Sequence, residues 1–258
     1  MLRVATLSSV LALMASVAIA EEIKVGVSPG EHAEIMEEVA KVAAPMGLDI
    51  DVVEFSDYVI PNTALADGDI DANSFQHVPY LENQMKDRGF ELVVVGNTIT
   101  TPMGIYSDKI EDIADLEDGA KVAIPNDPTN GGRALLLLQD LGLVTLAEGT
   151  GLVPSPLDIE DNPKGLKFLE LDAAQLPRTL ADAEIAIINT NYAIASGLSP
   201  KEDSIAMEKA DSPYVNVIVV RKGDEDQPWV KTLVEAYHSD EVKTFIEESY
   251  DGAVITSW

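Results

Sequence analysis

Short apolar runs alternate with longer segments of helical periodicity from residue 23 onward. The run Ile23–Val27 predicts a strand, and Ile35, Val39 and Val42 recur at the spacing of one helix face. The alternation continues with strands predicted at 48–55, 70–75 and 92–95 and helices at 33–44, 59–66 and 77–88. Strands that alternate with helices pair in parallel through right-handed crossovers. The pattern therefore predicts an α/β layered lobe.

A second series of the same kind follows the acidic, helix-prone stretch 111–117. Its predicted elements are strands at 121–124, 166–171, 184–188 and 214–220 and helices at 130–141 and 176–181. The remainder of the chain is predicted to be helical, because its apolar residues share one helix face: Val230, Leu233, Val234 and Tyr237. Two such series predict two α/β lobes.

The first twenty residues have the composition of a secretory signal peptide. Arg3 supplies one positive charge, residues 4–17 carry none, and Ala18-Ile19-Ala20 places small residues before a cleavage site. A buried N-terminal helix would need an amphipathic pattern that this segment lacks. No later segment reaches the roughly 18–20 apolar residues of a membrane span. We expect cleavage after Ala20 and an exported, soluble mature protein.

The charge balance narrows the range of partners. The 258 residues include 17 Lys and Arg against 45 Asp and Glu, for a net charge of −28. Such a field repels phosphate backbones and anionic lipid headgroups, so we expect no nucleic-acid partner and no membrane-surface partner. A solvated acidic surface is the simplest interpretation of the charge.

The chain lacks the residues that most catalytic mechanisms require. The chain contains no cysteine, which excludes thiolate nucleophiles, disulfides and Cys-ligated metals. It has no G-x-S-x-G, no phosphate-binding glycine loop and no H-E-x-x-H. Asp67, Asp69 and Asp71 imitate a calcium loop but lack its glycine and its final glutamate. We expect no catalytic residues, no metal and no cofactor.

Arg133 is the first candidate for ligand binding. It follows a predicted strand and a glycine-containing loop and lies in the first turns of an apolar helix. That position combines free backbone N–H groups, the positive end of a helix dipole and a bidentate guanidinium, which together suit a carboxylate. A surface arginine paired with one of the many acids is the alternative.

Two further groups of residues are candidates. Phe75, His77 and Tyr80 lie where a strand ends and a helix begins, and with Tyr58 they could enclose an apolar or thioether side chain. Asn189 and Asn216 are associated with strands, and their amides could hold the charged groups of a zwitterion. Core packing for the rings, and turn or edge positions for the asparagines, are the alternatives.

Six segments, in the same order along nearly the whole mature chain, closely resemble the methionine-binding lipoprotein family, the substrate-binding subunits of methionine ABC importers. They are VEFSDYVIPN (53–62), GDIDANSFQHVPYL (68–81), VGNT (95–98), VAIPNDPTNGGRALLLLQ (122–139), AAQLPRTLADAEIAIINTNYA (173–193) and SPYVNVIVVR (212–221). The FQH-x-PY and PNDPTN-x-x-R blocks are specific to this family.

The resemblance implies a two-lobed periplasmic binding protein of the type II kind, with two inter-lobe crossovers and the ligand in the cleft. Residues 21–110 and 205–258 would form lobe 1 and residues 111–204 lobe 2. The ligand would be methionine, delivered to an ABC permease and its ATPase.

By matching position, the resemblance also implies roles for the site residues. Arg133 would clamp the α-carboxylate, and Asn189 and Asn216 would bond the amino-acid head group. Four rings would surround the thioether: Tyr58, Phe75, His77 and Tyr80. Asn191 stands where the family more often has threonine, so it would either add a contact or face solvent.

In one respect the chain departs from the family. Members commonly carry a lipid-anchored cysteine at the cleavage site, whereas this chain has none. We therefore expect a protein without a lipid anchor that diffuses freely in the periplasm. Another apolar amino acid, D-methionine and a short methionine-containing peptide stay open as ligands, because one methylene changes affinity by only about 1–3 kcal/mol. A periplasmic hydrolase or lyase on the same fold, or a purely structural exported protein, would be the rival classes.

Overall fold

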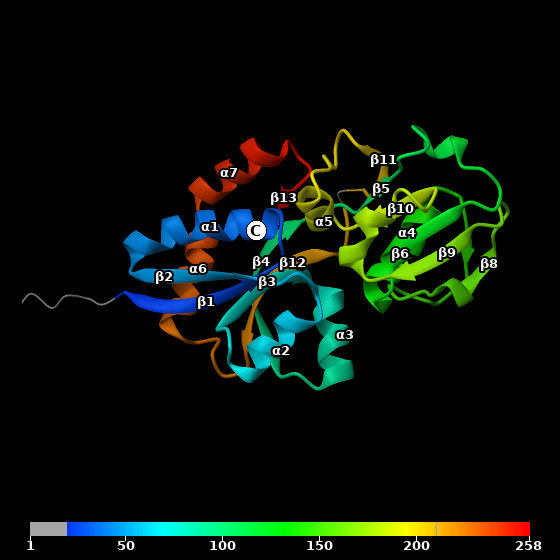
Figure 1. Ribbon diagram of the computed structural model, residues 1–258. Helices are drawn as coiled ribbons and strands as arrows, with labels where there is room; N and C mark the ends of the chain where they lie inside the picture. The colour runs from blue at the N-terminus through cyan, green and yellow to red at the C-terminus, as the bar shows by residue number, and fades with distance from the viewer. Residues whose placement is uncertain (1–19, 210) are drawn as a thin grey trace, which may run out of the picture.

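The computed structural model describes residues 20–209 and 211–258, so the predicted signal peptide lies, except for Ala20, outside the described residues. Two sheets divide this part of the chain into two lobes, shown in Figure 1. Lobe 1 is built from β1 (Glu21–Val27), α1 (Glu31–Ala43), β2 (Leu48–Glu54), α2 (Ile60–Asp67), β3 (Ala72–His77), α3 (Val78–Arg88), β4 (Leu92–Thr100), β12 (Val215–Arg221), α6 (Pro228–Tyr237), α7 (Asp240–Tyr250) and β13 (Ile255–Thr256). Lobe 2 is built from β5 (Gly104–Tyr106), β6 (Lys121–Pro125), α4 (Pro128–Asp140), β7 (Thr145–Leu146), β8 (Ile159–Asp161), β9 (Lys167–Leu171), β10 (Ile185–Ile188), α5 (Thr190–Ala195) and β11 (Ser204–Met207). Four short 3₁₀ turns complete the described elements: η1 (Ala44–Met46), η2 (Ile113–Asp115), η3 (Pro156–Asp158) and η4 (Ala173–Thr179).

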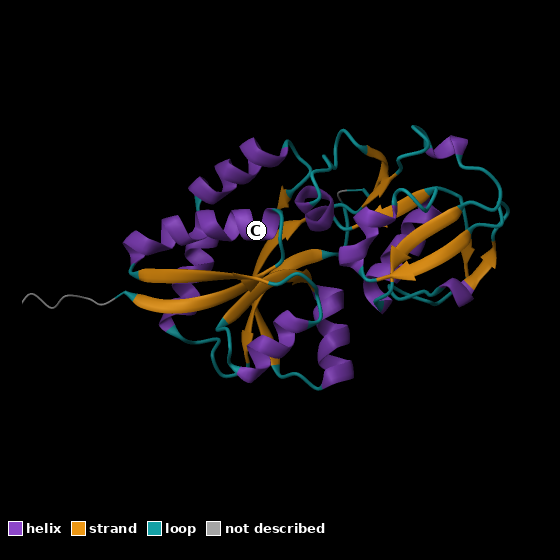
Figure 2. Cartoon of the chain, in the orientation of Figure 1, coloured by secondary structure: helices purple, strands orange, loops and turns teal. Residues whose placement is uncertain are grey.

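Lobe 1 is a sheet covered by helices on both faces (Figure 2). Its strand order is β13-β4-β12-β3-β1-β2. Successive residues of β12 point to opposite faces, as the period of a strand requires. Ile218 and Val220 pack with α1, α6 and α7, whereas Val217 and Val219 pack with α2 and α3. Helices on both faces explain why the central strand β3 is buried along its whole length.

Lobe 2 repeats this layered arrangement around a sheet of order β11-β5-β10-β6-β9. Ile185 and Ile187 of β10 face the apolar side of α4, and Ala186 and Ile188 face η4 and α5. β7 and β8 form a separate two-stranded ribbon. The apolar runs of the sequence thus form four clusters, one on each face of the two sheets.

The chain crosses between the sheets twice, at residues 101–103 and 208–214. Neither crossover coincides with the lobe boundaries implied by the resemblance, which lie after residue 110 and before residue 205. β5 and β11 belong to the second sheet, although residues 104–110 and 205–207 were assigned to lobe 1. The reason is that these two short strands pair with each other and with β10, a contact that local periodicity does not encode.

The prediction of parallel pairing is wrong for part of each sheet. β12 runs antiparallel to both β3 and β4, and β5 runs antiparallel to β10 and β11. In each case the strand enters its sheet directly from a crossover rather than through a βαβ unit. The helix expected near 176–181 is the 3₁₀ turn η4, which contains Pro177, and the stretch 111–117 forms only η2.

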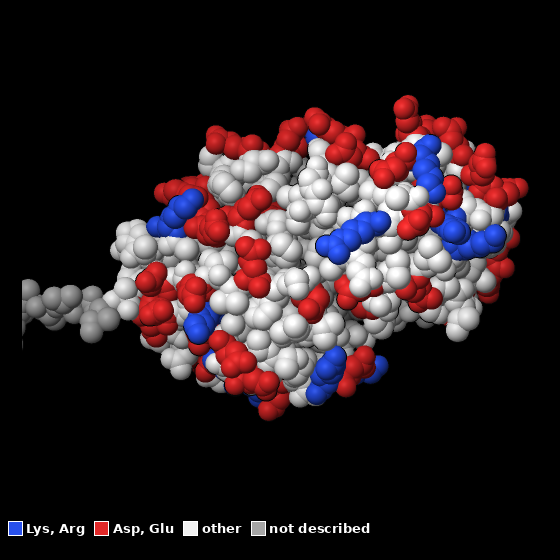
Figure 3. Space-filling model, in the orientation of Figure 1, with Lys and Arg blue, Asp and Glu red and all other residues white. Residues whose placement is uncertain are grey.

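The surface carries the charge that the composition predicts. Acidic side chains lie in groups on both lobes of the face in Figure 3, among uncharged side chains and scattered basic ones. Among the described residues, no helix is long and apolar enough to cross a membrane.

The two lobes meet closely where α1 begins. Gly30 precedes α1 with φ 84° and ψ −143°, a conformation that essentially only glycine adopts. A Cβ atom added there would lie 2.5 Å from the carbonyl oxygen of Asn191 in lobe 2. Backbone from one lobe therefore rests directly on backbone from the other.

Replacing Gly30 with alanine should separate the lobes. We expect Gly30→Ala to lower the free energy of unfolding by more than the matched variant Gly68→Ala. Gly68 also has positive φ but meets nothing within 4 Å, so alanine there costs only the left-handed strain of about 1–2 kcal/mol. Urea titrations measure the difference, and small-angle scattering should show a larger radius of gyration for Gly30→Ala alone. Equal losses and unchanged dimensions would contradict the expectation.

Candidate functional site

A small pocket lies between the lobes. Residues of lobe 1, of lobe 2 and of the first crossover line it: His32, Tyr58, Phe75, Gln76, His77, Tyr80, Thr101, Asn130, Arg133, Asn189, Asn191 and Asn216. All seven side chains singled out from the sequence are among these twelve, together with Asn191. The sequence did not single out His32, Gln76, Thr101 or Asn130.

Arg133 is placed by the local structure of α4. Asp127 caps this helix by accepting a hydrogen bond of 2.9 Å from the backbone N–H of Asn130, and Pro128 begins it. Gly131 and Gly132 allow close packing, since a Cβ on either would lie within 3 Å of a backbone oxygen. The loop that suggested a carboxylate site thus serves to hold the start of α4 tightly against its neighbours.

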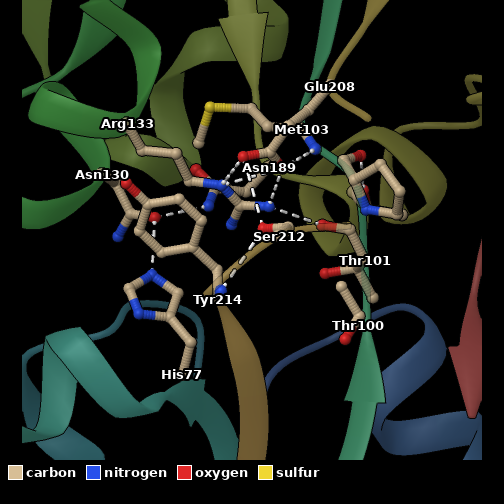
Figure 4. Close-up of polar contacts among 12 residues, drawn as sticks. His77, Thr100, Thr101, Met103, Asn130, Arg133, Asn189, Glu208, Ser212 and Tyr214 are labelled. Carbon is tan, nitrogen blue, oxygen red and sulfur yellow. Dashed lines mark hydrogen bonds and ion pairs between the residues drawn. The ribbon is translucent and has the colours of Figure 1, made fainter. Parts of the chain in front are cut away.

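Figure 4 shows that the Arg133 guanidinium is held on one edge. Its Nε donates to both carboxylate oxygens of Glu208, at 3.2 and 3.1 Å, and Nη2 donates to Glu208 and, at 2.8 Å, to the carbonyl of Thr101. The Tyr214 ring lies 4.3 Å from the Arg133 Cζ. Arg133 is 3% exposed, so it is not a surface arginine, yet it does pair with an acid. Nε and Nη2 are used in these contacts, whereas Nη1 makes no hydrogen bond to any described residue and is the nitrogen left for a ligand.

A chain of polar side chains joins the lobes beside Arg133. His77 Nδ1 accepts a hydrogen bond from the backbone N–H of Tyr80, so the neutral ring carries its proton on Nε2. That Nε2 donates to Asn130 Oδ1 at 3.2 Å, and Asn189 Nδ2 donates to the same oxygen at 2.8 Å. Burial, together with the nearby charge of Arg133, lowers the pKa of His77 to about 3. His77 is therefore a fixed, uncharged donor.

The two predicted asparagines are both buried and lie in different lobes. Asn189 caps the start of α5, and its Oδ1 has no hydrogen-bond partner among the described residues. Asn216 lies on β12 opposite His77, and its Nδ2 donates to the carbonyl of Ile99 at 3.2 Å. One amide oxygen is thus free to accept from a ligand, and the other amide is oriented by the backbone.

The ring residues form an aromatic wall. Tyr58 has its ring centroid 6.0 Å from Phe75, 6.0 Å from Tyr80 and 5.0 Å from Tyr192. Its hydroxyl donates to Asn191 Oδ1 at 2.5 Å, which links lobe 1 to lobe 2. Asn191 therefore faces inward, one of the two possibilities left by the sequence. Sequence reasoning missed Tyr192, which follows Asn191 on a helix too short to show periodicity.

A buried carboxyl lies next to the pocket wall. Glu31 is fully buried, and no side chain of the described residues donates to its oxygens. Burial raises the pKa of Glu31 to about 8, against a smaller opposing effect of its backbone N–H. The adjacent His32 lines the pocket, burial lowers its pKa to about 4, and its Nδ1 has no partner in the described part of the chain. At neutral pH both groups are uncharged.

The chemistry of the pocket is that of holding a small polar molecule with an apolar tail. It offers a cation, an unpartnered acceptor on Asn189, an unpartnered ring nitrogen on His32, an unpartnered donor on Asn191 and a wall of rings. Within residues 20–209 and 211–258, no cluster of three or more His, Asp or Glu residues is placed to hold a metal. A hinged pair of α/β lobes around such a pocket is the architecture of periplasmic substrate-binding proteins.

Comparison with known proteins agrees with this class. The sequence model described as NlpA lipoprotein matches residues 23–258, so the chain belongs to that family, as the resemblance predicts. The D-methionine-binding lipoprotein MetQ of Escherichia coli K12 is 52% identical over 239 residues, which cover 92% of this chain and 88% of the relative. A nutrient-binding protein from Burkholderia cenocepacia bound to methionine is 53% identical, with a TM-score of 0.90 over 92% of this chain and all of the other. A crystal structure of the methionine-binding protein MetQ has 52% identity and a TM-score of 0.89, covering 92% and 98%.

Glu31 should make stability depend on pH. The pKa of Glu31 is raised in the folded protein. Its contribution to the free energy of unfolding is therefore fully present below about pH 4.5 and is lost as the pH rises through 8. As the pH rises through this window, Glu31→Gln should become more stable relative to the parent protein. The unfolding constant of the parent should rise by up to about tenfold per pH unit relative to that of the variant. Urea titrations at pH 5, 6.5 and 8 measure the gain. Glu37→Gln, on an exposed position of the same helix, should show no such trend. A pH-independent difference for Glu31→Gln would refute the assignment.

Proposed function

We propose that this protein is the substrate-binding subunit of an ABC importer and that it captures methionine. The observation that carries the proposal is the convergence of Arg133, two asparagines and four ring residues from distant segments on one inter-lobe pocket. A methionine-bound relative of 53% identity supports the choice of ligand. The protein binds its ligand and releases it unchanged, because the pocket contains no nucleophile with an adjacent base.

The pocket contacts assign a role to each part of the ligand. The α-carboxylate binds Nη1 of Arg133, while Glu208 and Thr101 hold the other two guanidinium nitrogens. The α-ammonium donates to Asn189 Oδ1, and Asn216 contacts the head group. The thioether lies among Tyr58, Phe75, His77 and Tyr80, where sulfur–aromatic contacts add to the burial of the apolar chain.

Closure follows from contacts that bridge the lobes. Tyr58 bonds to Asn191, and His77 bonds to Asn130, in each case from lobe 1 to lobe 2. A ligand that touches both sides stabilises the closed state relative to the open one. The permease and its ATPase then receive the closed, loaded protein.

The size of the pocket favours one amino acid over a peptide. Side chains from both lobes close around the pocket and leave little free space between them, which suits a small molecule. Both enantiomers of methionine belong in the test, because the Escherichia coli relative is named for D-methionine.

Arg133→Ala should abolish most methionine binding. The ligand carboxylate would lose its charged partner inside a desolvated pocket, and we expect the dissociation constant to rise by about 100-fold or more. Arg133→Lys should recover little, because an ammonium cannot replace the planar guanidinium. Calorimetry with L- and D-methionine measures both, with Arg178→Ala, an exposed arginine, as the control.

Methionine should also raise the stability of the parent protein. At 100 times its dissociation constant the gain is about 2.7 kcal/mol, measurable as a thermal shift. Unchanged binding in Arg133→Ala would sink the assignment of that residue. The absence of a thermal shift with both enantiomers would refute methionine as the ligand.

The protein is further proposed to act in the periplasm without a lipid anchor. The signal-like segment ends in Ala18-Ile19-Ala20, and the chain offers no cysteine thiol for lipid attachment. Mass spectrometry of the protein exported from a Gram-negative host should give an unmodified mature chain that begins at Glu21. Osmotic shock should release it in soluble form. A lipid-sized mass increment, or retention with the membrane, would contradict this part of the proposal.

A further inference from the structure

Glu208 lies behind Arg133, on the side away from the pocket. It follows β11 and is held by the backbone N–H of Met103 at 3.3 Å and by the Ser212 hydroxyl at 3.5 Å. Arg133 lines the inter-lobe pocket, whereas Glu208 lines a separate surface groove with Asp140, Lys209 and Tyr214. The two charged groups therefore form one pair with its cation toward the ligand and its anion toward the exterior.

This pair sets the charge of the site. Among the twelve lining residues, Arg133 alone is charged at neutral pH, because burial lowers the pKa values of His32 and His77 to about 4 and about 3. The Arg133 side chain is 3% exposed and that of Glu208 16%, so water screens their charges poorly. Taken together, the cation and its counter-ion are neutral before any ligand enters.

We propose that Glu208 is a specificity-determining residue, which makes the pocket select a neutral zwitterion over an anion of the same shape. The inference rests on the proposed function and adds a basis for recognising the amino acid as a class. A zwitterion brings no net charge to a neutral site. An anion that lacks the ammonium leaves an uncompensated negative charge near Glu208.

The expected size of the effect follows from Coulomb's law. Both ligands carry the carboxylate, so its repulsion by Glu208 cancels in the ratio of their affinities. What differs is the attraction of Glu208 for the ligand ammonium, which at about 8–10 Å and an effective dielectric constant near 20 is on the order of 15–30-fold. Replacing Glu208 by glutamine leaves Arg133 unneutralised and removes this attraction. It also weakens the positioning of Arg133, which affects every carboxylate ligand alike. The ratio of two affinities separates these effects.

The experiment compares methionine with its 2-oxo acid, which keeps the carboxylate and thioether but lacks the ammonium. Calorimetry on the full mature protein gives both dissociation constants for the parent protein and for Glu208→Gln. We expect the parent protein to prefer methionine strongly, and the preference to narrow by about tenfold or more in Glu208→Gln. Glu208→Asp, which keeps the charge, should retain most of the preference even where both ligands bind more weakly.

Asp140→Asn is the matched control. Asp140 lines the same groove and pairs with Lys209 at 3.0 Å, but the pair is exposed and does not touch Arg133. Removing this charge should leave the preference unchanged. Equal weakening of both ligands in Glu208→Gln would overturn the proposal, as would a parent protein that binds the oxo acid as tightly as methionine. The proposal would also be overturned if Asp140→Asn reduced the preference for methionine over the oxo acid as much as Glu208→Gln does, or if Glu208→Asp lost that preference. Failure of the parent protein to bind methionine would instead reject the proposed function.

Discussion

Burying the charge of Arg133 is the constraint around which the rest of the site is arranged. A guanidinium that is 3% exposed needs hydrogen-bond acceptors, and both inter-lobe crossovers supply them. Thr101 belongs to the first crossover, and Glu208 and Tyr214 belong to the second. This residue of the pocket wall is therefore tied to both segments through which the lobes are connected. Any change in the angle between the lobes has to be accommodated by the contacts of this one side chain.

The remaining polar groups of the site are positioned by the ends of secondary structure. The His77 side chain caps α3, Asn189 occupies the N-cap position of α5, and Asn130 lies in the first turn of α4 beside the cap of Asp127. Each of these residues thus lies at a helix start, where backbone N–H groups are unsatisfied and the chain direction is set. Their mutual hydrogen bonds then join three helix N-termini at one point between the lobes. Rigid elements, rather than mobile loops, carry the site.

The sequence predicts much of this arrangement because the relevant signals are local. The loop before Arg133 and the strand-to-helix boundary at His77 lie within short segments, so their position made these residues candidates, and the family resemblance then favoured binding over the alternatives. Glu208 could not, because it lies 75 residues from Arg133 and is one of 45 acidic residues with nothing in its neighbourhood to distinguish it. The short strands β5 and β11 were missed for a related reason. They owe their existence to pairing across the sheet, which a local pattern of apolar residues does not record.

The contact at Gly30 has a consequence for the signal that this protein passes on. Two backbones, rather than two flexible side chains, meet there, so the distance of closest approach between the lobes is fixed by main-chain geometry. No ligand can draw the lobes closer together than this contact allows, and a ligand that fits poorly makes the closed form less frequent. A partner that recognises this limiting shape would then meet the same shape for every ligand that reaches it, and it would meet that shape more often for a ligand that fits well.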